Sequence, residues 1–374
     1  MDKKVKLLSI CKPKQYKTIS KNELVEDGKY LVYGANGVIG KSNKYTHENP
    51  TLMVTCRGAT CGSLNISKPF SYINGNAMAF DSIDKNFDLM YLYYYLSSRG
   101  FNDAISGTAQ PQITRENLKN IDVLELSLKK QKQIAKTLDK AQELIDLRKD
   151  SIAKLDELAK SIFIDMFGDP VSNPKGWKKN KISDTYINKG DFVDGPFGSD
   201  LKVSDRTDDG IRIIQINNIG INEFRNSNKA YISEKKYLTL KRHEAIRGDI
   251  VIAKMGEPIA RSCFLPNYLE KAIIVADCMR LRVSSVNFNP KFICFYLNFD
   301  STKCLINNLT HGSTRVRINL SILKTLEILN PPIELQNKFA KTIEKIEEQK
   351  SLYEQELEKL EENFQALLQQ SFSE

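Results

Sequence analysis

The chain has 374 residues, of which 41% are hydrophobic, and it carries a net charge of +9. This length allows two domains of ordinary size, and the apolar content argues against global disorder. No apolar run approaches the roughly 18 residues that span a bilayer, and the basic start MDKKVKLLSI lacks the apolar region of a signal peptide. We therefore expect a cytoplasmic protein with no membrane partner.

Cysteine and histidine usage gives no sign of a metal centre. The seven cysteines form no Cys-x-x-Cys pair, and the chain has only three histidines. An odd number of cysteines without a pairing pattern is typical of reduced thiols. The sequence therefore predicts no metal site on this chain.

Positive charge is concentrated outside two segments, 128–169 and 331–374. The first contains 9 Lys and Arg against 8 Asp and Glu, and the second contains 5 against 10. Subtracting these from totals of 55 and 46 leaves 41 against 28 in the other 288 residues, a net of +13. The two basic segments, 1–127 and 170–330, have the charge expected of domains that bind a polyanion.

Near the start, YGANGVIGKS (residues 33–42) resembles the phosphate-binding loop of nucleotide-binding enzymes. Such a loop requires a helix directly after its Lys-Ser pair, but the following NKYTHENPT favours a turn and then a strand. No convincing magnesium-binding strand is found elsewhere in the sequence. We therefore predict turns between strands here and not a nucleotide site.

Both basic segments have the pattern of a mixed α/β fold. Short runs rich in β-branched residues and bounded by turn residues predict strands at KYLVYG, TLMVTC, IRIIQI, DIVIAKM and AIIVADCMRLRV. LMYLYYYLSS and KFICFYLNF predict helices with aromatic residues on a buried face. GDPVSNPKGWKKN, rich in Pro and Gly, predicts a linker between the two halves.

A long helix is predicted after each basic segment. From Ile134 and again from Phe339, a stripe of mostly apolar residues recurs in steps of four and three for more than four heptads. Neither run contains Gly or Pro, and Gly168 followed by Pro170 ends the first helix. One helix cannot bury such a stripe, so we expect the two to pack together; packing on the helix's own globular segment is the alternative. The expected contact residues are Ile134, Leu138, Ile145, Ile152, Leu155, Phe339, Ile343, Ile346, Leu357 and Leu360.

The sequence also contains an internal repeat. GTAQPQITRENLKNI, from Gly107, corresponds to GSTRVRINLSILKTL, from Gly312, at an offset of 205 residues. The same offset places QKQIAKTLDKAQE on QNKFAKTIEKIEE and holds without a gap as far as Phe167 on Phe372. Upstream, the offset drifts to 201 and then 198, as loop insertions would produce. The pattern predicts a tandem duplication in which each copy is a globular part followed by a helix.

Two features raise the possibility of an enzyme. NPPI, ending at Ile333, resembles the N-P-P-aromatic signature of amino-methyltransferases, but the aromatic residue and a glycine-rich cofactor loop are missing. Its prolines instead predict a stiff entry to the second long helix. The three histidines, His47, His243 and His311, are scattered and accompany no G-x-S-x-G motif. We interpret the chain as a binding protein and not a catalyst.

Along its whole length the chain resembles the specificity subunit of type I restriction–modification systems. The most specific match is SGTAQPQITRENLKNIDVLELSLKKQKQIAKTLDKAQELI, continuing to SIFIDMFGDP. YGANGVIGK with VTCRGATCGSLN, and DGPFGSDLK with RGDIVIAKMGEPIAR, resemble recognition-domain segments. The first copy lacks the usual Pro pair before its helix, and the second has lost Gln-Pro from its turn.

The resemblance implies an α/β (α+β) fold in which two target-recognition domains, 1–127 and 170–330, alternate with spacer helices, 128–169 and 331–374. The helices would pack as an antiparallel coiled coil with pseudo-twofold symmetry and set the distance between two half-sites of double-stranded DNA. Two methyltransferase subunits carrying S-adenosylmethionine would dock on them, and restriction (motor-nuclease) subunits using ATP and magnesium would complete the complex. No cofactor is expected on this chain. The alternatives are a stand-alone two-domain DNA-binding regulator or, less favoured, an adenine methyltransferase.

Base reading requires side chains that form paired hydrogen bonds, with Arg or Lys suited to guanine and Gln or Asn to adenine. Under the resemblance, the candidate DNA contacts are Lys41, Arg57, Thr60, Gln110, Gln112, Ser199, Lys202, Lys254, Arg261, Arg315 and Arg317. Lys41, Ser199 and Lys202 are candidates for phosphate contact. For each Arg or Lys, the alternative is a solvated surface charge. For the matching segments TAQPQ and STRVR, the alternative is a structural turn that leads into the next strand.

Overall fold

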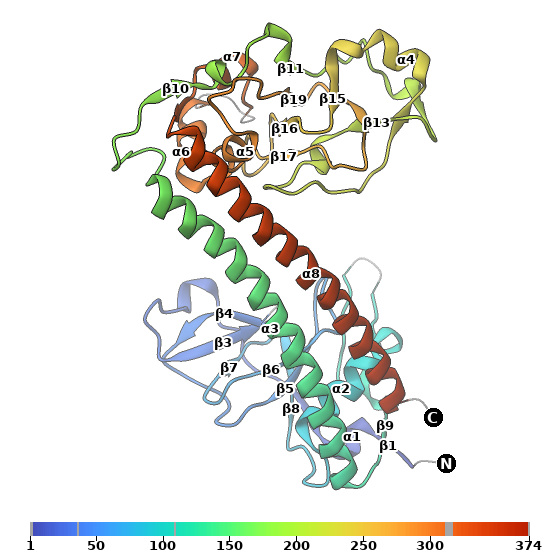
Figure 1. Ribbon diagram of the computed structural model, residues 1–374. Helices are drawn as coiled ribbons and strands as arrows, with labels where there is room; N and C mark the ends of the chain where they lie inside the picture. Colours follow the sequence, from blue (N-terminus) through green and yellow to red (C-terminus); the bar gives the residue numbers. More distant parts are fainter. Residues whose placement is uncertain (1–2, 36, 108–109, 311–316, 373–374) are drawn as a thin grey trace. The chain divides into compact units, whose positions relative to one another are not determined.

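The computed structural model describes residues 3–35, 37–107, 110–310 and 317–372 (Figure 1). It separates into two compact units, one made of residues 1–151 with 353–374 and the other of residues 152–352. Each unit combines small sheets with helices. Each also contains part of both long helices, α3 (Leu128–Phe167) and α8 (Ile333–Phe372).

The first unit contains three small sheets. A four-stranded antiparallel sheet has the order β2-β8-β5-β6, a three-stranded sheet has the order β4-β3-β7, and β1 pairs with β9. Their bounds are β1 (Lys4–Lys6), β2 (Lys12–Gln15), β3 (Tyr30–Gly34), β4 (Gly37–Ser42), β5 (Leu52–Thr55), β6 (Leu64–Ile66), β7 (Tyr72–Ile73), β8 (Ala77–Asp81) and β9 (Asp122–Leu124).

The main core of the first unit lies between its four-stranded sheet and two helices, α1 (Leu7–Ile10) and α2 (Leu89–Arg99). Helix α2 begins at the N-cap Asp88, whose carboxylate accepts from the backbone N–H groups of Met90 and Tyr91. The Tyr91 ring is fully buried in this core, and its hydroxyl donates to Leu124 O at 2.8 Å. The aromatic run in this helix therefore forms the buried face that the sequence predicts.

The segment that resembles a phosphate-binding loop is a β-hairpin. Strands β3 and β4 are antiparallel, with Gly34 opposite Gly37 and Leu31 opposite Lys41. No helix follows Ser42 before α2 in the described part of the chain. The sequence predicts turns between strands here, but Gly34 lies in β3 and Gly37 and Gly40 lie in β4, so the glycines belong to the paired strands of the hairpin.

The second unit also contains three sheets. A four-stranded sheet has the order β11-β19-β16-β17, a five-stranded sheet has the order β12-β14-β13-β18-β15, and β10 pairs with β20. Their bounds are β10 (Lys179–Lys181), β11 (Phe192–Asp194), β12 (Arg206–Thr207), β13 (Ile211–Ile214), β14 (Tyr231–Ile232), β15 (Glu244–Ile246), β16 (Ile250–Ala253), β17 (Ser262–Phe264), β18 (Lys271–Ile274), β19 (Cys278–Leu281) and β20 (Glu327–Leu329).

Helices cover the four-stranded sheet of this unit and close its largest core. They are α5 (Pro290–Asn298), α6 (Asp300–Leu309) and α7 (Leu320–Thr325), while α4 (Glu234–Thr239) belongs to the five-stranded part. The ring of Phe163 from α3 lies within 5.8 Å of Phe292 from α5 and 5.5 Å of Phe339 from α8. Aromatic packing thus fixes both long helices to this core.

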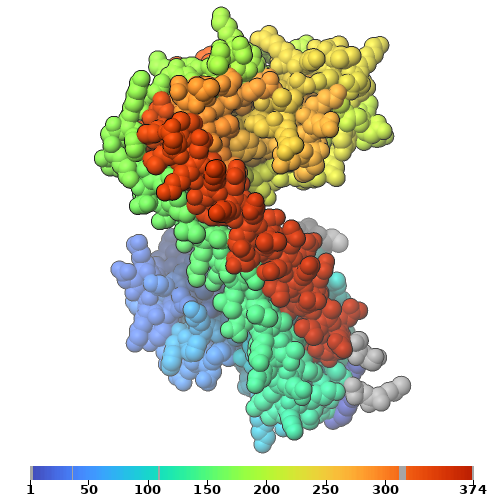
Figure 2. All heavy atoms as spheres, viewed as in Figure 1, coloured from blue at the N-terminus to red at the C-terminus, as the bar shows by residue number. Residues whose placement is uncertain are grey.

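The long helices begin and end close to the predicted positions. Gly168, with φ of +79°, directly follows α3, as expected of a glycine that ends a helix. All ten predicted contact residues are buried or half-buried, and none is exposed. In Figure 2 the outer face of α8 is open to solvent, as expected for a helix with one apolar stripe.

A buried glutamine forms the same pattern of hydrogen bonds in each unit. The side chain of Gln131 accepts from Asp88 N at 2.8 Å and donates to Asn86 O at 3.0 Å and Leu126 O at 2.8 Å. In the second unit, Gln336 accepts from Asn289 N at 2.9 Å and donates to Asn287 O at 3.1 Å and Pro331 O at 2.8 Å. Both side chains are fully buried, and each ties the start of a long helix to the N-cap of an aromatic helix.

Candidate nucleic-acid interface

The first unit brings together two side chains that the sequence selects separately. Arg57 follows strand β5 and forms an isolated antiparallel bridge with Gln112. Two backbone hydrogen bonds hold this bridge, from Ile113 N to Cys56 O at 3.0 Å and from Gly58 N to Pro111 O at 3.2 Å. Both side chains are exposed, so a guanidinium and a carboxamide are presented from one rigid point.

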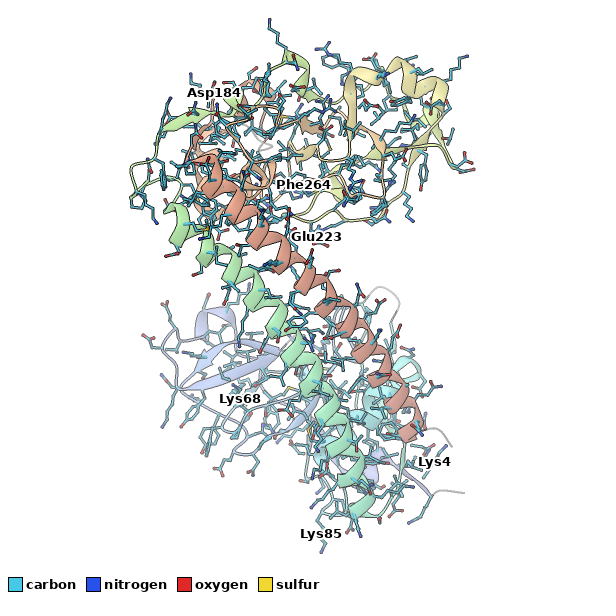
Figure 3. All side chains as sticks on the ribbon, viewed as in Figure 1. Lys4, Lys68, Lys85, Asp184, Glu223 and Phe264 are labelled. Carbon is cyan, nitrogen blue, oxygen red and sulfur yellow. The ribbon has the colours of Figure 1, made fainter. Side chains whose placement is uncertain are left out.

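The other first-unit candidates lie on exposed surface. Gln110 is exposed two residues before Gln112, and Thr60 is exposed in the turn where its carbonyl accepts from Ser63 N at 3.0 Å. Lys41 is exposed on β4 of the hairpin. Exposed lysines such as Lys68 also project from this unit (Figure 3).

The second unit contains the same bridge. Met255 pairs with Arg317, and Ile318 N donates to Lys254 O at 2.9 Å. These positions follow from Arg57, Gln112, Ile113 and Cys56 at the offsets of 198 and 205 residues seen in the sequence. Arg317 is exposed, lies 3.0 Å from Asp277 in an ion pair and donates to Ala276 O at 3.3 Å. Arg315 lies outside the described residues.

Two candidates have internal partners. Lys254 is only 7% exposed, and its ammonium pairs with Asp194 at 2.7 Å. The half-buried Arg261 guanidinium donates to four backbone carbonyls, two of them Ile219 O at 2.6 Å and Ile216 O at 3.2 Å, and burial lowers its pKa. These donors are therefore already engaged within the second unit.

Ser199 and Lys202 lie exposed in the loop after β11, which also carries Phe197. A cavity of about 310 Å³ opens beside this loop. It is lined by Lys202 and Arg206 from the loop, by Asn217 from the turn after β13, and by Ala276 and Asp277, the residues that Arg317 contacts. The sequence reasoning missed Arg206, Asn217 and Phe197, because nothing in their spacing distinguishes them from other loop residues.

The histidines have structural partners where they are described. His47 Nε2 lies 3.0 Å from Asp81, and His243 Nδ1 lies 2.6 Å from Asp194 O, while His311 lies outside the described residues. Within the described ranges, no group of three or more His, Cys, Asp or Glu side chains is placed to hold a metal ion. Likewise, none of the helices described has the length and apolar character that crossing a bilayer requires.

The same fold occurs in solved structures. An S subunit of a type I restriction–modification system from M. genitalium superposes with a TM-score of 0.62 and 16% identity, covering 100% of this chain and 96% of that one. A structure on complex assembly and conformational transition of the type I R-M system matches with a TM-score of 0.57 and 15% identity over 99% and 97% of the two chains.

Two relatives found by sequence are specificity subunits of type I restriction enzymes. The MjaVIII specificity subunit of Methanocaldococcus jannaschii is 25% identical over 351 residues, which cover 88% of this chain and 81% of that protein. The EcoprrI specificity subunit of Escherichia coli is 26% identical over 115 residues, 31% of this chain and 28% of that protein. The chain belongs to the family described as type I restriction modification DNA specificity domain, which matches residues 2–157 and 174–362. It is a specificity subunit of a type I restriction–modification system.

Proposed function

We propose that this subunit reads a bipartite DNA target without catalysing a reaction itself, each unit reading one half. The observation that carries this proposal is the repeated bridge, Arg57 with Gln112 in one unit and Met255 with Arg317 in the other. Exposed Arg and Gln side chains can form the paired hydrogen bonds that distinguish guanine and adenine in the major groove. Lys41, Ser199 and Lys202 would contact phosphates, which position a protein on DNA without reading sequence.

The chain is, in this proposal, a tandem duplication of one recognition domain and one spacer helix. The matching hydrogen bonds of Gln131 and Gln336 support it, because their partners Asp88 and Asn289 are also N-caps at an offset of 201 residues. The domain boundaries would be 1–127, 128–169, 170–330 and 331–374. The observed helix starts, Leu128 and Ile333, support these boundaries.

The two spacer helices would pair as an antiparallel coiled coil. Within the first unit, Arg148 pairs with Glu356 at 2.7 Å and Lys149 with Glu361 at 2.8 Å. Within the second unit, Lys350 pairs with Asp156 at 2.7 Å. Further along the helices of the first unit, Leu138 clusters with Leu368, and in the second unit Phe163 lies against Phe339. Within each unit the residue numbers therefore rise along one helix as those of the partners fall, which is the order that antiparallel pairing requires. Such a pair would act as a ruler that sets the number of bases between the half-sites.

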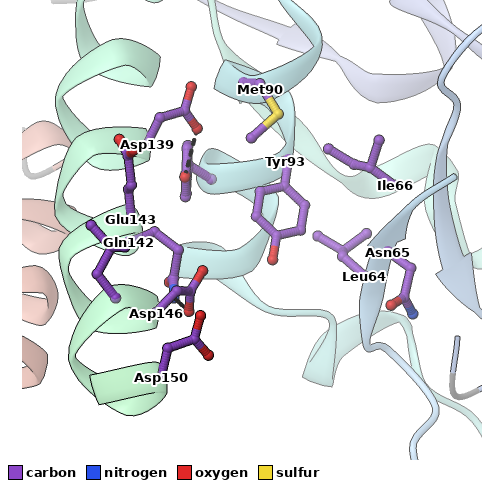
Figure 4. Close-up of a pocket in the computed structure, with 12 residues that line it drawn as sticks. Leu64, Asn65, Ile66, Met90, Tyr93, Asp139, Gln142, Glu143, Asp146 and Asp150 are labelled. Carbon is purple, nitrogen blue, oxygen red and sulfur yellow. Dashed lines mark hydrogen bonds between the residues drawn. The ribbon is translucent and has the colours of Figure 1, made fainter. Parts of the chain in front are cut away.

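The same helices would dock two methyltransferase subunits. Leu147 and Leu352, at an offset of 205 residues, are 55% and 54% exposed. In the first unit, Leu147 lines a cavity of about 470 Å³ between α3 and the surface made by α2 and β6 (Figure 4). Carboxylates on α3, among them Asp146 and Asp150, line its other wall. A surface of this kind repels DNA and fits a protein partner with apolar and basic side chains.

The partners would carry the chemistry: S-adenosylmethionine on the methyltransferase subunits, and ATP with magnesium on the restriction (motor-nuclease) subunits. Co-expression with the methyltransferase subunit tests whether the partner, and not this chain, catalyses the methyl transfer. We expect a complex with two methyltransferase copies that transfers methyl groups to adenine, and no transfer by this chain alone. Isolation only as a stand-alone DNA binder would favour a regulator, and methyl transfer by the chain alone would assign it the catalysis.

A deletion tests whether the helix pair sets the number of bases between the half-sites. Removing seven residues from one helix, Glu143–Lys149, keeps the apolar stripe in phase but shortens it by roughly 10 Å at roughly 1.5 Å per residue. We expect loss of assembly or a changed number of unspecified bases in the methylated motif. Unchanged assembly and spacing would contradict the ruler.

A further inference from the structure

The turn that follows strand β13 in the second unit presents a further candidate for contact with a DNA base. Two neighbouring asparagines in this turn have opposite surroundings. Asn218 is fully buried, accepts from Gln215 N at 2.9 Å and donates to Arg225 O at 2.9 Å and Ser227 O at 2.7 Å. Asn217 is exposed, and among the described residues its side chain forms no hydrogen bond. Asn218 therefore builds the turn, and Asn217 is presented by it.

The turn is held rigidly beside the bridge that contains Arg317. The guanidinium of Arg261 donates to Ile216 O and Ile219 O on the turn and, at 3.3 Å, to Met255 O. Met255 is the residue that pairs with Arg317. The half-buried side chain of Arg261 thus connects the turn of Asn217 to the bridge of Arg317, so the two exposed side chains keep a fixed spacing.

Asn217 lines the cavity of about 310 Å³ beside the loop after β11. Arg317 reaches two of its lining residues, Ala276 by a hydrogen bond and Asp277 by an ion pair. Lys202 and Arg206 also line this cavity, and neither forms an ion pair within the described part of the chain, although Arg206 donates to Gln215 Oε1 at 3.5 Å. The cavity is therefore bordered by exposed cationic side chains and hydrogen-bonding groups, which suits the edge of a duplex with its phosphates.

An exposed aromatic side chain stands at the same loop. Phe197 is 82% exposed and lies between Pro196 and Gly198, two residues that line the cavity. An exposed phenylalanine gains nothing for the isolated fold, whereas it can contact a thymine methyl group or a base step in DNA. This places apolar surface next to the polar reading groups, a combination common at base-reading surfaces.

We propose that Asn217 is a specificity-determining residue that reads an adenine in the half-site of the second unit. Its free carboxamide has the donor and acceptor that match adenine N7 and N6, and Lys202 and Arg206 hold the flanking phosphates. The proposal rests on the proposed function and adds one base position to it. It also predicts which base pair is read, namely A·T.

The test uses the complete complex of this chain with its methyltransferase, acting on a duplex library with every base randomised. Methylated molecules are sequenced for the native chain, Asn217→Ala and, as matched control, Asn226→Ala, an exposed asparagine in the same unit that does not line the cavity. We expect Asn217→Ala to relax one A·T position of one half-site by about 5- to 150-fold in preference, the range for one paired base contact. The control should retain the native motif.

An unchanged motif with Asn217→Ala, or relaxation only at G·C positions, would overturn the proposal. If Asn217→Ala abolishes methylation, binding of the complex to library duplexes decides the case. Retained binding to the other half-site supports the proposal, and loss of binding to all sequences contradicts it. A native complex that methylates no specific sequence would instead contradict the proposed function, so the two failures are distinguishable.

Discussion

The guanidinium of Arg148 lies 4.1 Å from the centre of the Tyr353 ring, and the two residues are separated by the same 205 positions that relate the proposed repeats. The contact is one that the proposed antiparallel pairing of the two helices would produce. It also explains why a charged residue can occupy the apolar stripe, since Arg148 stacks on the ring and pairs with Glu356.

A double-mutant cycle tests this contact. We expect Arg148→Ala and Tyr353→Ala to be coupled by about 0.5–2 kcal/mol in the free energy of unfolding, the range for a cation–π contact. The control cycle uses Lys149→Ala with Tyr353→Ala, because Lys149 pairs with Glu361 instead. Additive effects for Arg148 and Tyr353 in urea unfolding would show that the contact does not stabilise the helix pair.

The two buried glutamines should stabilise their own units. Gln131→Ala leaves the backbone N–H of Asp88 and two carbonyls without partners, so we expect a loss of about 1–3 kcal/mol. Amide hydrogen exchange should speed up in α2 for Gln131→Ala and in α5 for Gln336→Ala. Gln355→Ala, on the exposed face of α8, is the control and should change neither helix. Equal exchange in all variants would rule out this role.

Stability should depend on pH through Lys303. This buried lysine has no hydrogen-bond partner among the described residues, and burial lowers its pKa from 10.5 to about 7. Between these two values the unfolded chain binds more protons than the folded chain. Stability contributed by this site therefore rises with pH from about 7 to about 10.5, and its full cost is present below about 7.

The variant Lys303→Met removes the charge and keeps most of the volume. We expect it to raise the free energy of unfolding by about 1–3 kcal/mol at pH values below about 7 and to flatten the dependence above. Lys338→Met, at an exposed position of α8, is the control. Urea unfolding across this pH range measures both, and parallel curves for the native chain and Lys303→Met would contradict the assigned cause.

The loop that carries Phe197 should depend on one glycine. A Cβ added to Gly195 would lie 1.9 Å from Val275 O, so Gly195→Ala must move either the loop or the segment that lines the cavity. We expect weaker binding to duplexes that contain the second half-site and a lower melting temperature. Gly190→Ala, in the same unit but outside the lining of the cavity, meets no atom within 4 Å and should leave both unchanged. Similar behaviour of the two variants would contradict the packing argument.

Hydrophobic periodicity and the positions of glycine, proline and polar turn residues made most of the architecture predictable. The stripes from Ile134 and Phe339 predicted both long helices, Gly168 predicted the end of the first, and the polar stretch after Ser42 argued against the helix of a phosphate loop. These features are local, because a helix or hairpin depends on residues close in sequence. The helices are nevertheless longer than the periodic stripe, since Gln131 and its equivalent extend them by bonds to distant backbone groups.

The candidate site was less predictable, because surface chemistry depends on distant partners. Lys254 and Arg261 were selected for residue type, yet each has its charge engaged by groups far away in sequence, Asp194 and the turn at Ile216. Asn217 and Asn218 are adjacent and identical in type, and only the fold shows that one is structural and the other exposed. Arg57 and Gln112 are the reverse case, since only the fold shows that they meet.

We propose that each unit specifies one half of a bipartite DNA target. The most direct test is to map adenine methylation by the complex containing the native chain, Arg57→Ala or Arg317→Ala. We predict a native motif of two specified halves separated by unspecified bases, with Arg57→Ala altering one half and Arg317→Ala the other. A continuous motif, or changes by both variants in the same half, would contradict the claim.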